Sequence, residues 1–77
     1  MERVKLIDPK TGENVSSNVA EIGHDPSANE LEVLFHGGRA YRYRNISPEL
    51  HRAIMLAPSI GSFFHTAVVK QPQKYPF

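Results

Sequence analysis

Residues 41–44 alternate aromatic and guanidinium side chains, in the order Tyr41, Arg42, Tyr43 and Arg44. Successive side chains of a β-strand point to opposite faces, so a strand here separates the two tyrosines from the two arginines. Exposed aromatic rings stack on the bases of single-stranded RNA, and basic side chains contact its phosphates. The predicted nucleic-acid-binding residues are these four together with two further cations, Arg39 and Arg52.

The other chemically reactive side chains form no catalytic or metal-binding pattern. The chain has no cysteine, and its four histidines, at positions 24, 36, 51 and 65, are scattered. No two of them have the close spacing that zinc sites use. The sequence also lacks a phosphate-binding loop and a nucleophile motif, and Gly37-Gly38 is typical of a hairpin turn. We expect no enzymatic activity, no metal and no cofactor.

Charge is distributed unevenly along the chain. Residues 1–38 contain three basic and seven acidic side chains, a net charge of −4, whereas residues 39–77 contain six basic and one acidic, a net charge of +5. One interpretation is an anionic partner for the second half. The other is that acidic and basic strands pair across one sheet.

Alternating apolar residues separated by turn residues predict a sheet of three or four strands. The expected strands cover residues 3–6, 19–23, 30–35 and 40–46. Turns are expected around Asp8-Pro9-Lys10-Thr11-Gly12 and Asp25-Pro26, because proline and glycine favour turn conformations.

The turn between the last two strands decides which side chains share a face. A two-residue Gly37-Gly38 turn would place the tyrosines on one face of the sheet and the apolar side chains of Leu31, Val33 and Phe35 on the other face. A three-residue loop with Gly38 in the left-handed conformation instead pairs Val33 with Tyr41 and Leu31 with Tyr43. On the other face it pairs Leu34 with Ala40, Glu32 with Arg42 and Glu30 with Arg44.

We prefer the three-residue loop, because aromatic–aliphatic and acid–base pairs are the favoured cross-strand neighbours. The tyrosines are then core residues. Their alternative role is as a platform for a ligand.

Two helices follow the predicted sheet. Ser47-Pro48-Glu49 has the cap, first-turn proline and acid of a helix start, and Pro58 ends that helix. Its expected apolar stripe is Leu50, Ala53, Ile54 and Ala57. Ser59 or Ser62 caps a second helix to about Val69, with a buried stripe of Phe63, Phe64, Ala67 and Val68. The tail, residues 71–77, is expected to be extended, with Tyr75 and Phe77 returning to the sheet.

The predicted fold class is therefore α+β, an antiparallel three- to four-stranded meander sheet with two helices packed on one face.

Several short segments together resemble the KTSC domain. They are Ser16-Ser17-Asn18-Val19, Ile22-Gly23, Leu31-Glu32-Val33 with Phe35, Gly38 with Tyr41-Arg42-Tyr43, Pro48, Gly61-Ser62-Phe63-Phe64 and Lys74-Tyr75-Pro76-Phe77. The resemblance covers residues 16–77. Residues 1–15 form an N-terminal segment outside it that is expected to add a strand. His24 and His65 depart from the tyrosine and asparagine that many members have at these positions.

The resemblance implies RNA binding, because the domain also occurs at the C-terminus of some lysyl-tRNA synthetases; this is an argument by analogy. We expect a non-enzymatic small binding domain, with RNA as the first partner. The alternative is a protein-binding adaptor or inhibitor, for example a phage-type accessory protein. The chain has no apolar run of membrane-spanning length and its first residues lack a secretory signal, so we expect no membrane association and a cytoplasmic location.

Overall fold

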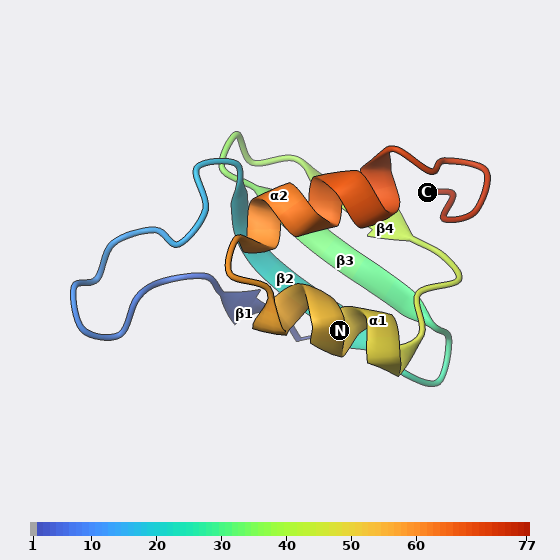
Figure 1. The fold of residues 1–77 in the computed structure, drawn as a ribbon, viewed down its shortest axis with the longest axis horizontal. Helices are drawn as coiled ribbons and strands as arrows, with labels where there is room; N and C mark the ends of the chain where they lie inside the picture. Colours follow the sequence, from blue (N-terminus) through green and yellow to red (C-terminus); the bar gives the residue numbers. More distant parts are fainter. Residues whose placement is uncertain (1) are drawn as a thin grey trace.

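The computed structural model describes residues 2–77 and shows a four-stranded antiparallel sheet with two helices on one face (Figure 1). The strands are β1 (Val4–Lys5), β2 (Val19–Asp25), β3 (Glu30–Phe35) and β4 (Ala40–Tyr43), and they lie in sequence order. The helices are α1 (Pro48–Leu56) and α2 (Ile60–Phe64), and a π-helical turn, η1 (His65–Val69), continues α2. This arrangement confirms the predicted α+β meander, including a short strand in the N-terminal segment.

The β3–β4 hairpin has the predicted three-residue loop. Gly38 adopts a φ of +92°, and the Phe35 N–H donates to the Arg39 carbonyl at 2.8 Å. A φ in this range is accessible to glycine at little cost. The observed pairs include Val33 with Tyr41, Leu31 with Tyr43 and Glu32 with Arg42. The preferred register is therefore confirmed.

Strand β4 ends at Tyr43, three residues before the predicted end. Asn45 takes a φ of +64°, which breaks the extended conformation, and the Arg44 N–H donates to the Pro76 carbonyl at 2.7 Å. The predicted pair of Glu30 with Arg44 is therefore wrong. Glu30 instead lies 3.7 Å from the Arg42 guanidinium.

The hydrophobic core lies between the sheet and the helices. Phe64 of α2 is fully buried, with its ring centroid 5.3 Å from that of Tyr43 and 6.2 Å from that of Phe35. The other buried apolar side chains are Leu6, Val19, Ile22, Leu31, Val33, Ile46, Ile54 and Val68. No helix within residues 2–77 is long and apolar enough to cross a bilayer.

The helix start at Ser47 is confirmed, because its hydroxyl accepts from the Leu50 N–H at 3.1 Å. Ser59 occupies the cap position of α2, but its hydroxyl does not cap. The predicted buried stripes were partly wrong: Ala53 and Phe63 are exposed. The stripe of the second helix runs through Ile60, Phe64 and Val68, so Phe63 is turned toward solvent.

The tail folds back instead of remaining extended. The Lys74 and Tyr75 N–H groups both donate to the Gln71 carbonyl, which closes a turn. Phe77 then places its ring 5.2 Å from Tyr41 and 5.5 Å from Tyr43, and Tyr75 is half-buried. The predicted return of these two aromatic residues to the sheet is confirmed.

The neighbouring phenylalanines of α2 give a matched test of this packing. We expect Phe64→Ala to lower the free energy of unfolding by about 3–5 kcal/mol, because it empties a fully buried site. Phe63→Ala should cost about 1 kcal/mol or less, because that ring is already 38% exposed. Urea unfolding followed by circular dichroism measures both. Equal losses would contradict the observed orientation of the helix.

Candidate functional site

The six predicted nucleic-acid-binding residues do not form one surface. Arg42 lies on the open face of the sheet, where its Nε donates to Glu32 at 3.0 Å and its Nη1 lies 3.7 Å from Glu30. Glu32 also contacts Arg3, which pairs with Glu21 as well. The hydrogen bond to Glu32 raises the pKa of Arg42 above its ordinary value. The open face thus carries a network of two arginines and three glutamates, which contains the predicted pair of Glu32 with Arg42.

The two tyrosines lie on the opposite, helix-covered face. Tyr43 is only 4% exposed, and burial raises the pKa of its hydroxyl above the ordinary value of 10.0. Its ring is enclosed by Phe64 and Phe77, so it offers no face to a base. The structure therefore places Tyr43 in the core, which corrects its inclusion among the ligand-facing residues. Tyr41 is half-buried and remains at the surface.

The remaining three arginines are exposed but lie apart. Arg52 belongs to α1, on the helix-covered side of the molecule, whereas Arg39 closes the β3–β4 turn and Arg44 follows β4. None of the three forms an ion pair within residues 2–77. Arg52 therefore belongs to the helix layer and not to the hairpin.

Aromatic and basic residues follow β4, the edge strand of the sheet, from the hairpin turn to the tail. We call them the edge patch; they are Arg39 at the hairpin turn, Tyr41 within β4, and Arg44, Lys74 and Phe77 at the end of β4 that the tail covers. Hydrogen bonds from the Arg44 N–H to Pro76 and from the Asn45 side chain to the Lys74 carbonyl, at 2.7 and 3.3 Å, fix the tail beside β4. The Phe77 ring contacts Tyr41 yet stays 68% exposed.

Sequence reasoning missed Lys74 and Phe77 as site residues. The predicted return of Phe77 to the sheet was the available signal, but the turn that brings the tail beside β4 depends on contacts distant in sequence. Lys74 lies with its ammonium 5.5 Å from the Tyr75 ring, a cation–π contact that leaves it at the surface.

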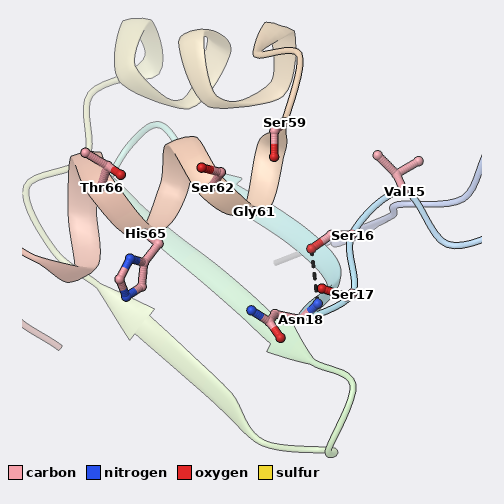
Figure 2. Close-up of a pocket in the computed structure, with 9 residues that line it drawn as sticks. All are labelled: Val15, Ser16, Ser17, Asn18, Ser59, Gly61, Ser62, His65 and Thr66. Atoms are coloured by element: carbon pink, nitrogen blue, oxygen red, sulfur yellow. Dashed lines mark hydrogen bonds between the residues drawn. The ribbon is translucent and has the colours of Figure 1, made fainter.

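A separate cleft of about 470 Å³ lies between α2–η1 and the segment that precedes β2 (Figure 2). We call it the hydroxyl cleft; its lining residues are Val15, Ser16, Ser17, Asn18, Ser59, Gly61, Ser62, His65 and Thr66. Its lining contains five hydroxyl groups, one carboxamide and one imidazole, and no carboxylate, ammonium or guanidinium group. Hydrogen-bonding capacity without formal charge is the main property of this cleft.

The floor of the hydroxyl cleft is held by Ser16. Its buried hydroxyl accepts from the Asn18 and Val19 N–H groups at 3.2 and 3.1 Å, which ties the loop to the start of β2. A Cβ at Gly61 would lie 2.6 Å from this hydroxyl, so the absence of a side chain lets α2 approach the loop. Sequence reasoning had treated Ser62 only as a helix cap.

Two histidine rings join α1 to β2. His24 and His51 stack with centroids 4.8 Å apart and an interplanar angle of 10°. His24 Nε2 lies 2.7 Å from the Ile46 carbonyl, the geometry of an imidazole N–H donor. Burial, and then the proximity of His24, lower the pKa of His51 below its ordinary value of 6.5. Within residues 2–77, no three metal-ligating side chains lie together.

Comparison with known proteins assigns the family. Residues 15–71 match the family model of the KTSC domain. The chain belongs to the KTSC domain family. Among similar proteins, an uncharacterized protein of Stutzerimonas stutzeri (strain A1501) is 39% identical over 62 residues, covering 80% of this chain and 84% of that protein. A protein of Tsukamurella paurometabola is 34% identical over 53 residues, covering 69% and 79% respectively.

The family match covers all of one surface of this KTSC domain and only part of the other. All residues that line the hydroxyl cleft fall within the matched range of 15–71. Lys74 and Phe77 of the edge patch lie beyond it, although the other three patch residues lie within it. The cleft is also where two segments that carry the resemblance, residues 16–18 and 61–62, come together in space.

The histidine pair predicts a pH dependence of stability. Because the pKa of His51 is lower in the folded chain, His51 binds a proton at a higher pH in the unfolded chain than in the folded chain as the pH falls. The free energy of unfolding should therefore be highest above about pH 6.5 and decrease as the pH falls from there through the folded pKa of His51. Urea titrations across this range measure it.

The matched variant is His51→Gln, which removes the titrating group but keeps a polar side chain. We expect its stability to vary less with pH over the same window. An identical slope for the wild type and the variant would contradict the role given to His51.

Proposed function

We propose that this KTSC domain is a non-enzymatic module that binds single-stranded RNA through the edge patch. The observation that carries the proposal is the exposed Phe77 ring, held against Tyr41 on an edge strand that Arg39 and Arg44 flank. Aromatic faces together with basic side chains are the usual means of holding an unpaired strand. The proposal places the protein in the cytoplasm with its ligand.

The charges of the edge patch support this choice. Arg39, Arg44 and Lys74 form no ion pair within residues 2–77, whereas Arg42 is neutralised by Glu30 and Glu32. The positive charge of the second half of the chain is thus available at the sheet edge and not on the open face. A guanidinium group binds a phosphate through two parallel hydrogen bonds, which suits Arg39 and Arg44 to this role.

The aromatic part of the edge patch favours RNA over a partner that is bound by charge alone. Phe77 offers an exposed ring, and a base stacked on such a ring contributes about 1–3 kcal/mol. Because every base has a flat aromatic face, this contact tolerates different sequences. We therefore expect binding with little preference among bases from this surface alone.

Substitution of the patch cations tests the proposal. We expect Arg39→Ala and Arg44→Ala each to weaken binding of a single-stranded RNA. Each should also reduce the slope of log affinity against log salt by about 0.7, the value for one phosphate contact on a single strand. Fluorescence anisotropy with labelled oligo-uridine, repeated at several salt concentrations, measures both quantities.

Arg52→Ala is the matched control, because Arg52 is also exposed but lies on α1. It should leave affinity and slope nearly unchanged. Binding that is independent of salt, or an equal loss for all three variants, would overturn the proposal. Stoichiometric recovery of one protein partner without RNA binding would favour the adaptor alternative.

Aromatic stacking is tested separately. Phe77→Ala should lower the affinity for the same RNA by about 1–3 kcal/mol and leave the salt slope unchanged, because a stacking contact releases no counterions. Phe63→Ala is the control, since it removes another exposed ring that belongs to α2 and not to the tail. Equal effects of the two variants would exclude Phe77 as the stacking residue.

A further inference from the structure

We propose that the hydroxyl cleft holds the ribose and base edge of one unpaired nucleotide, so that the domain prefers RNA to DNA. This inference rests on the RNA binding proposed for the edge patch and adds a second, uncharged subsite to it. The cleft volume of about 470 Å³ lies within the range of small-ligand sites, about 300–1,000 Å³.

The polar groups of the cleft are not used by the fold. Among the lining side chains, Ser16 alone takes part in a hydrogen bond within residues 2–77 (Figure 2). The side chains without such a bond are those of Ser17, Asn18, Ser59, Ser62, His65 and Thr66. Ser59 even occupies the cap position of α2 while its hydroxyl caps nothing. These groups are therefore available to a ligand once water is displaced.

The chemistry of the lining selects the kind of ligand. With no charged side chain, the cleft offers little to a phosphate or a carboxylate, and Val15 is its only aliphatic side chain. Hydroxyl, carboxamide and imidazole groups both donate and accept hydrogen bonds. The ribose 2′-hydroxyl does the same, and it is the group that distinguishes RNA from DNA. A ribonucleoside matches this lining better than an ionic or an apolar group.

The cleft adjoins the hairpin end of the edge patch. The Asn18 carbonyl accepts from the N–H of His36 at 2.9 Å, and His36 begins the hairpin turn that Arg39 closes. A strand whose phosphates meet Arg39 can therefore place a neighbouring nucleotide in the cleft.

The test compares a short oligo-uridine RNA with the oligo-deoxyuridine of the same length, which lacks only the 2′-hydroxyl. We expect the wild-type protein to bind the RNA about fivefold to tenfold more tightly, the effect of one well-formed hydrogen bond. Ser62→Ala and Asn18→Ala should bring this ratio close to one by weakening RNA binding alone. Arg39→Ala should weaken both ligands and keep the ratio. Ser27→Ala, in the turn at the other end of the sheet, is the control.

The outcomes separate the two proposals. Equal, salt-dependent affinity for RNA and DNA, or a ratio unchanged by Ser62→Ala, would overturn the cleft inference while nucleic-acid binding stands. Failure of both oligomers to bind would reject the RNA function. In that case a titration with uridine and with 2′-deoxyuridine tests the cleft by itself. Binding is followed by NMR through the amide resonances of Ser62 and Thr66. A response to uridine alone would support the nucleoside site, and no response or equal responses would reject it.

Discussion

The left-handed conformation of Gly38 is the local constraint on which the arrangement of this KTSC domain depends. It closes a three-residue loop, and the loop fixes the register of β3 against β4. Because side chains alternate between faces, a slip of one residue would exchange the faces of β4. The observed register puts Tyr43 under Phe64 and Arg42 beside Glu32. Core packing and surface charge are thus satisfied by the same turn.

The same register also determines where positive charge remains. Arg42 and Arg3 are compensated by the three glutamates of the open face, so that face has little net potential for an anionic ligand. Arg39 and Arg44 flank β4 and escape this pairing, and the folded tail adds Lys74, whose carbonyl accepts from the side chain of Asn45, the residue after Arg44. The tail also supplies Phe77, whose ring covers Tyr43 on one side and remains exposed on the other. One segment therefore completes the core and extends the surface.

The predicted and observed sites differ for reasons that can be traced to particular contacts. Alternation correctly separated the tyrosines from the arginines, and the acid–base pairing of Glu32 with Arg42 was anticipated. Arg44 lost its predicted partner because Asn45 leaves the strand and the Arg44 backbone binds Pro76. The hydroxyl cleft was not anticipated, since its walls come from segments more than forty positions apart in the sequence, around Ser16 and Ser62. Each of these differences arises from contacts between distant segments.

The sequence by itself determined the fold class, the strand order, the helix start at Ser47 and the family resemblance. These follow from local signals: two-residue periodicity, turn residues and capping groups act over a few positions. Only the tertiary structure decided that Phe63 faces solvent, that a turn at Gln71 brings the tail to the end of β4, and that α2 approaches Ser16 closely enough to form a cleft. Those features depend on how helices and tail pack on the sheet. Packing is a property of surfaces that meet only after the chain has folded.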